Sequence, residues 1–119
     1  MTMDAVNLEA KLATFAEYFQ PRTVGEFNGH DLMVAKLRGP FVWHAHDDTD
    51  DFFLVLRGRL TIELRDRVVR LGPGELFVVP RGTDHRPVAR AGEAKLLLID
   101  PVDLPNTGDA ATATRAVEI

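Results

Sequence analysis

The sequence predicts an all-β protein, a sandwich or barrel of antiparallel strands preceded by one N-terminal α-helix. Two observations support this fold class. Between residues 21 and 101, short apolar segments alternate with Gly, Pro, Asn and Asp at the spacing typical of sandwiches and barrels. The segment with helical periodicity precedes all of these strands, which is unlike the alternation of strands and helices in a parallel α/β sheet.

Length and composition indicate a single domain over residues 1–119. The hydrophobic content of 45% and the charged content of 27% are typical of globular proteins. The net charge of -4 argues against a nucleic-acid partner, which requires a basic surface. The chain contains no cysteine, so disulfides and thiolate metal sites are excluded. No stretch approaches the roughly 20 apolar residues that cross a bilayer, and no signal-peptide pattern is present. We therefore expect a cytoplasmic protein without membrane contact.

Residues 6–19 are predicted to form the helix. Four apolar residues recur at spacings of four, three and four, which places them on one helical face: Leu8, Leu12, Phe15 and Phe19. Asp4 or Asn7 can cap the start, and Pro21 follows the end. We expect the apolar face to pack against the strands.

The predicted barrel covers residues 22–101. Asn28-Gly29 is the strongest two-residue hairpin signal in the chain. Gly, Pro and Asp punctuation separates the remaining segments. The expected strands are 22–27, 30–38, 41–46, 51–56, 59–64, 68–71, 75–80, 85–89 and 95–100. Residues 102–119 are predicted to form a C-terminal arm.

A pair of histidines gives the first functional signal. His44 and His46 stand two residues apart, so both imidazoles face one side if the segment is extended. Imidazole is a preferred ligand of divalent transition metals, and an oxygen donor nearby is a typical further ligand. The nearest carboxylates are Asp47, Asp48, Asp50 and Asp51. Most of this acidic run is expected in a solvated loop, because consecutive acids repel one another.

Two motifs resemble those of the cupin superfamily. The first is matched by Gly39, His44, His46, Asp51 and Gly58, with aspartate where the family has glutamate. The second is matched by Gly74, Pro80, Gly82 and His85, with Ala89 in place of asparagine. The leading helix and the stretches VGEFNG and NTGD also resemble a subgroup of small single-domain cupins, often labelled mannose-6-phosphate isomerase-like.

The resemblance implies a double-stranded β-helix, the jelly-roll barrel of cupins. It also implies a site for one divalent transition metal per chain, of the group Fe, Mn, Ni, Co and Zn. The implied ligands are His44, His46, Asp51 and His85. Because aspartate is one methylene shorter than glutamate, Asp51 binds the ion directly, binds through water, or leaves it to the histidines. Asp50 is a competing carboxylate.

Strand alternation predicts the surroundings of this site. Counted from the two histidines, Val42 faces inward, whereas Phe41 and Trp43 face outward. The next strand is counted from Asp51, which places Phe53 and Val55 in a mostly apolar substrate cavity. Apolar residues of that strand then face outward and need a cover: Phe52, Leu54 and Leu56. Either a packed helix or a second subunit would cover them, and the resemblance implies the second subunit, so we expect a homodimer.

These features favour a metal-dependent enzyme that acts on a small organic molecule, as a dioxygenase, an isomerase or epimerase, or a lyase. No catalytic residue beyond the metal ligands stands out. No cationic group is expected inside the cavity, which argues against a phosphosugar substrate. Two other functions stay open. One is a non-catalytic module that binds or senses a small ligand, and the other is a storage-like barrel with weak metal affinity.

Overall fold

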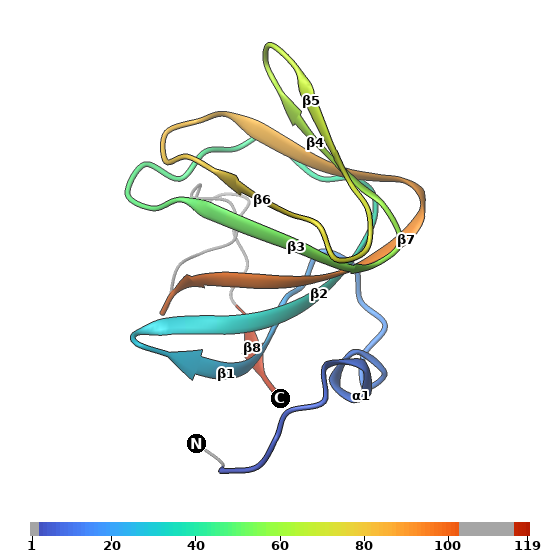
Figure 1. The fold of residues 1–119 in the computed structure, drawn as a ribbon, viewed down its shortest axis with the longest axis vertical. Coiled ribbons are helices and arrows are strands. Elements are labelled where there is room, and N and C mark those ends of the chain that lie inside the picture. The colour runs from blue at the N-terminus through green and yellow to red at the C-terminus, as the bar shows by residue number, and fades with distance from the viewer. Residues whose placement is uncertain (1–2, 103–115) are drawn as a thin grey trace.

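The computed structural model describes residues 3–102 and 116–119, and its fold is the predicted all-β jelly roll with one helix before the strands (Figure 1). The helix is α1 (Leu8–Leu12). The strands are β1 (Arg22–Phe27), β2 (His30–Pro40), β3 (Asp51–Arg57), β4 (Leu60–Leu64), β5 (Val68–Leu71), β6 (Leu76–Val79), β7 (His85–Pro101) and β8 (Val117–Glu118). Most of the predicted C-terminal arm, residues 103–115, lies outside the described residues.

Strand β7 organises the sheet. The strand order is β5-β4-β7-β2-β1-β8, and β3 pairs with both β7 and β6. The first residues of β7 pair with β4, whereas its last residues lie between β2 and β3, so that Leu98 pairs with both Met33 and Phe53. The predicted segments 85–89 and 95–100 are therefore parts of one long strand. Among the described strands, β5 and β8 end this order, so the sheet curls without closing.

The core confirms the alternation predicted for β3. Asp51, Phe53 and Val55 are buried, and the residues between them are half-buried. The buried cluster joins side chains of several strands: Ala35, Leu37, Phe53, Val55, Leu60, Ile62, Leu71, Val79, Ala89, Ala94 and Leu96. Packing across the curled sheet thus fixes which face of each strand is internal.

The hairpin between β1 and β2 forms where the sequence predicts it. Asn28 and Gly29 have φ angles of 49° and 76°, and the flanking residues Phe27 and His30 pair directly. Two consecutive left-handed residues are the requirement of a type I′ turn, and asparagine followed by glycine adopts them at low cost.

The predicted helix over 6–19 is wrong in its extent, because α1 covers only Leu8–Leu12. Asn7 caps the helix as proposed, with its side-chain oxygen accepting the Ala10 N–H at 2.9 Å. The chain then leaves the helix, and the Phe19 N–H donates to the Lys36 carbonyl at 2.9 Å. The helix itself lies beside β2 (Figure 1). Because Phe19 is hydrogen-bonded to β2, the segment after α1 is not helical despite its helical spacing of apolar residues.

The predicted strand over 41–46 is also wrong, since this segment pairs only through an isolated bridge between His44 and His85. Phe41 lines the internal cavity and Val42 is 40% exposed, which reverses the predicted orientation. A register shift late in β2 and the loss of continuous pairing after it break the alternation on which the prediction depended.

Within residues 3–102 and 116–119, none of the helical segments has the length and apolar character needed to cross a membrane.

Candidate metal centre

Four buried polar side chains meet inside the jelly roll. Their exposed fractions are 7% for His44, 5% for His46, 7% for Asp51 and 1% for His85. His44 and His46 come from the segment after β2, while Asp51 begins β3 and His85 begins β7. The fold therefore brings together all four residues that the sequence proposes as metal ligands. Buried polar groups of this kind require partners or an ion.

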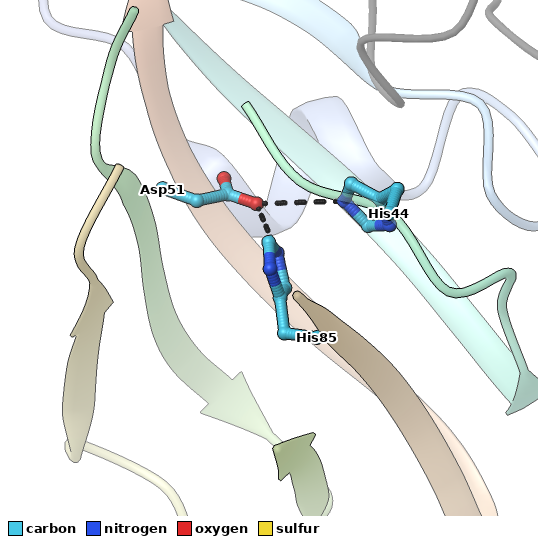
Figure 2. A group of neighbouring side chains, drawn as sticks. All are labelled: His44, Asp51 and His85. Carbon is cyan, nitrogen blue, oxygen red and sulfur yellow. Dashed lines mark hydrogen bonds and ion pairs between the residues drawn. The ribbon is translucent and has the colours of Figure 1, made fainter. Parts of the chain in front are cut away.

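The carboxylate of Asp51 lies at the centre of the group. Its Oδ2 atom is 2.8 Å from Nε2 of His85, 3.5 Å from Nε2 of His46 and 3.7 Å from Nε2 of His44. Figure 2 shows Oδ2 turned toward both His44 and His85. Around an ion bound at about 2.0–2.2 Å, neighbouring ligand atoms stand roughly 3–3.5 Å apart. The spacing of the cluster suits a single transition-metal ion.

His46 lies at the edge of the cluster. One ligand atom each from His44, Asp51 and His85 lie within 4.8 Å of one another, and His46 is not part of that group. Its ring centre is 6.3 Å from that of His85, whereas the His44 and His85 centres are 4.3 Å apart. The contact between Nε2 of His46 and Oδ2 of Asp51 nevertheless keeps His46 next to the group.

Backbone carbonyls orient two of the rings. Nδ1 of His44 lies 3.0 Å from the Val42 carbonyl oxygen, and Nδ1 of His85 lies 2.9 Å from that of Thr83. A carbonyl only accepts hydrogen bonds, so the partners assign the proton of each ring to Nδ1. The neutral rings then present the Nε2 lone pair to the centre, which is the arrangement of histidines that bind metals.

This arrangement requires a positive charge at the centre. A lone pair on Nε2 of His85 faces a carboxylate oxygen only 2.8 Å away, and the two repel unless a proton or a metal cation joins them. Burial raises the pKa of Asp51, but the close approach of the three imidazoles offsets it and holds this pKa well below its usual range. Asp51 is therefore an anion throughout the neutral range, and the donor set fits a divalent transition metal.

The acidic run behaves as expected, since Asp47, Asp48 and Asp50 are exposed. The carboxylate of Asp50 accepts the Arg81 backbone N–H at 2.9 Å and lies outside the cluster. Asp50, the competing carboxylate considered from the sequence, therefore binds the backbone of Arg81 rather than the histidine cluster. Asp51 reaches all three imidazoles despite its shorter side chain.

A cavity of about 60 Å³ adjoins the cluster, with His44, Asp51 and Phe53 in its wall. A single water molecule occupies roughly 10–15 Å³ of such a volume. The cavity is therefore several times larger than one water molecule and admits a small organic molecule. Most of the remaining wall is apolar and includes Met33, Ala35, Leu37, Leu96 and Leu98. Phe53 is thus placed at the cavity, whereas Val55 lies in the core and is not part of the described wall.

The sequence argument missed Asp100, which also lines the cavity. It is 7% exposed, and its Oδ1 atom has no hydrogen-bond partner among the described residues. Burial is the main cause that raises the pKa of Asp100 to about 7, with Asp51 and Asp31 adding to it and His46 opposing it. A signal was present in the sequence, because Asp100 continues the alternation of two inward leucines in KLLLID.

A protein-family comparison matches this part of the chain. The family model described as a cupin domain matches residues 32–100, which include the four clustered side chains and Asp100. The uncharacterized protein YdbB of Bacillus subtilis is 35% identical over 65 residues, which are 54% of this chain and 58% of that protein. The match thus spans less than two thirds of this relative.

Solved structures agree with the fold. A cupin-2 domain containing protein from Shewanella frigidimarina has a TM-score of 0.79 and 38% identity, covering 81% of this chain and 93% of that chain. A Neisseria meningitidis protein has a TM-score of 0.74 and 29% identity, covering 82% of this chain and 99% of that chain. These similarities identify the fold and the family. Membership of the subgroup labelled mannose-6-phosphate isomerase-like stays a prediction.

Proposed function

This chain belongs to the cupin family, and from that premise we propose that it is a metal-dependent enzyme acting on a small organic molecule. The proposed cofactor is one divalent transition metal per chain, of the group Fe, Mn, Ni, Co and Zn. The proposed ligands are His44, His46, Asp51 and His85. The observation that carries the proposal is the approach of three Nε2 atoms to one carboxylate oxygen beside an internal cavity.

The chain's own residues define what such a site can do. An ion held there acts as a Lewis acid toward a substrate oxygen. Phe53, Leu96 and Leu98 make the wall beside the cluster apolar, which would strengthen electrostatic interactions with a bound substrate. Within the described part of the chain, no lysine or arginine lines the cavity. A small, uncharged or weakly charged molecule therefore suits it better than a phosphosugar.

Dioxygenase, isomerase or epimerase, and lyase chemistry all use such an ion, and the fold alone does not choose among them. The alternative is a module that binds or senses a small ligand without converting it. An apolar pocket next to a metal also serves that purpose. The two functions differ in turnover, so a ligand that binds to the metal-loaded protein and is recovered unchanged would favour the binding module.

Metal content tests the proposal directly. The protein is loaded with Fe, Mn, Ni, Co or Zn in turn, freed of excess ion, and examined by elemental analysis. We expect close to one ion per chain in the wild type and loss of the ion in the double variant His44→Ala, His46→Ala. The matched control is His30→Ala, because His30 is exposed and its Nδ1 atom lies 3.0 Å from the carbonyl oxygen of Asn28 in the turn before β2. Wild-type protein that retains none of the five metals would overturn the proposal.

A homodimer is the proposed assembly. The face of β3, β6 and β7 opposite the cavity carries adjacent apolar side chains, paired across the strands: Phe52, Leu54, Leu76, Val78, Leu97 and Ile99. Leu76 and Val78 are 55% and 40% exposed. A second copy would remove this surface from water.

Light scattering after size-exclusion chromatography tests the assembly. We expect the wild type to elute as a dimer and Val78→Glu as a monomer, because the new charge lies within the apolar face. Val68→Glu is the control, since Val68 is similarly exposed at 43% but lies on β5. A monomeric wild type would contradict the proposed dimer.

A further inference from the structure

We propose that Asp100 is the acid–base residue of the cavity, and that it exchanges a proton with a small hydroxycarbonyl substrate. This inference rests on the proposed metal-dependent function and narrows it to proton-transfer chemistry, that of an isomerase or epimerase. It assigns a role to a side chain that lies outside the group of metal ligands.

The geometry places the carboxyl group of Asp100 inside the cavity. Leu96, Leu98 and Asp100 occupy alternate positions of β7, and all three line the cavity. The side chain is 7% exposed, and its Oδ1 atom has no hydrogen-bond partner among the described residues. A buried oxygen without a hydrogen-bond partner destabilises the folded protein. A ligand that donates a hydrogen bond to Oδ1 of Asp100 would remove this cost.

Asp100 is also the one titratable side chain of the described cavity wall that does not belong to the metal cluster. The described wall contains two others, His44 and Asp51, and both belong to the metal cluster. The rest of the described wall is apolar, so it offers no competing acid or base. A substrate held with one oxygen at the cluster would therefore meet a single proton-carrying side chain.

The surroundings of Asp100 suit proton transfer in both directions. Besides burial, the negative charges of Asp51 on β3 and of Asp31, the cross-strand partner of Asp100 on β2, raise the pKa of Asp100. His46, which follows β2 in the chain, lowers this pKa. In the metal-free protein, burial is the largest cause and, together with these groups, raises the pKa of Asp100 to about 7. Burial does not depend on the charge of the cluster, so it continues to raise this pKa when an ion is bound, and a general acid or base is most effective when its pKa lies near the working pH.

The proposed step is a balanced proton transfer. The Asp100 carboxylate takes a proton from the carbon next to the substrate carbonyl. The C–H electron pair forms a carbon–carbon double bond, and the carbonyl π pair moves onto the oxygen. For an isomer, Asp100 returns the proton to the former carbonyl carbon, while the hydroxyl group on the deprotonated carbon passes its proton to the enolate oxygen and becomes the new carbonyl. For an epimer, the intermediate turns over in the cavity and Asp100 returns the proton to the other face of the carbon from which it was taken. No oxidant or reductant enters.

Hydrogen exchange of a small hydroxyketone tests this role. Metal-loaded full-length protein is mixed with hydroxyacetone in deuterium oxide, and the loss of C–H signals beside the carbonyl is followed by proton NMR. Asp100→Asn preserves the shape of the side chain but cannot accept the proton. We expect its exchange rate to fall by at least about a hundredfold, the usual contribution of general acid–base catalysis. Metal content, measured on the same samples, should remain at the wild-type value.

Asp31→Asn supplies a matched control that changes the charge near Asp100 but not the cavity wall. It should retain exchange, with the pH profile displaced toward lower pH, because the loss of a negative charge lowers the pKa of Asp100. Infrared spectroscopy of metal-free protein gives a readout independent of turnover. We expect a protonated carboxyl band near pH 6 that disappears at higher pH and is absent in Asp100→Asn.

The outcomes separate the two proposals. Equal exchange by wild type and Asp100→Asn, or full metal loading of the wild type without exchange above that of buffer and ion, would overturn the role of Asp100 and leave the metal site standing. Wild-type protein that binds no metal would overturn the proposed function instead, and with it the step inferred for Asp100.

Discussion

The Nε2 atom of His85 lies 2.8 Å from Oδ2 of Asp51, while the Nδ1 atom of the same ring lies 2.9 Å from the carbonyl oxygen of Thr83. The carbonyl fixes a proton on Nδ1, so the contact with Asp51 needs a second positive partner. Either a proton or a metal cation would supply it. The contact therefore links the proposed metal binding to the release of a proton.

Metal binding should therefore release about one proton per ion, because the ligand nitrogen must lose its proton to coordinate. The measurement is titration calorimetry with Zn in buffers of different ionisation enthalpy at one pH. The observed enthalpy should change linearly with the buffer's ionisation enthalpy. An enthalpy that is independent of the buffer would contradict this account of the His85–Asp51 contact.

Substitution of Asp51 should show that its charge matters more than its length. Asp51→Asn removes the anion and should weaken metal retention at least about tenfold. Asp51→Glu tests whether the carboxylate is undersized. Because the aspartate already reaches the imidazoles, we expect no tighter retention and a stability loss of about 1–3 kcal/mol from overpacking. Dialysis against a chelator gives the retention, with Asp50→Asn as the exposed control. Tighter retention by Asp51→Glu would show that the aspartate is too short.

Ionisation of Asp100 should cost stability as the pH rises. Its pKa is raised from 3.8 to about 7 in the folded protein, so between these values the folded state binds more protons than the unfolded state. The free energy of unfolding then falls with increasing pH in that window, and the loss is complete above about pH 7. The loss is of the order of 4 kcal/mol, since one pKa unit corresponds to about 1.4 kcal/mol.

Urea denaturation of metal-free protein at pH 5 and pH 8 checks this sign. Asp100→Asn lacks the ionisation, so its stability relative to the wild type should increase between the two pH values. A relative stability that is constant or moves the other way would mean that the buried carboxyl keeps an ordinary pKa.

Val55→Ala should separate the core from the metal site. Val55 is fully buried in the core cluster, and the change removes two methyl groups and leaves a small void. We expect a loss of about 2 kcal/mol in the free energy of unfolding. Metal content should remain that of the wild type, because the side chain is not part of the described cavity wall. If the variant were fully folded but had lost the ion, Val55 would contribute to the metal site, contrary to its position in the structure.

Gly58→Ala should be more damaging than Gly29→Ala. Both glycines have positive φ angles, 78° and 76°, which cost an alanine about 1–2 kcal/mol. At Gly58 an added Cβ would also clash with the backbone oxygen of Glu93, whereas at Gly29 no atom of the described residues beyond its chain neighbours lies within 4 Å. Thermal unfolding should therefore show the larger decrease for Gly58→Ala. Equal decreases would mean that the backbone near Glu93 yields without cost.

Local sequence patterns were sufficient for much of the fold. The Asn28-Gly29 turn depends on two adjacent residues, and the inward set Asp51, Phe53 and Val55 depends on the alternation of one strand. The choice of the four clustered residues depended on the resemblance to a family. The patterns failed at 6–19 and at 41–46, where hydrogen bonds to distant strands decide the backbone.

By itself, the sequence determined the all-β class and the hairpin, because these follow from residue type and short-range spacing, and the resemblance of its motifs to a family indicated the four side chains proposed to hold a metal. Tertiary structure decided how Asp51 meets the three imidazoles, that Phe41 and not Val42 lines the cavity, and that Asp100 is buried there. Those outcomes depend on the pairing of β7 with both β2 and β3, which joins residues far apart in the chain. Spacing along one strand carries no information about such pairing.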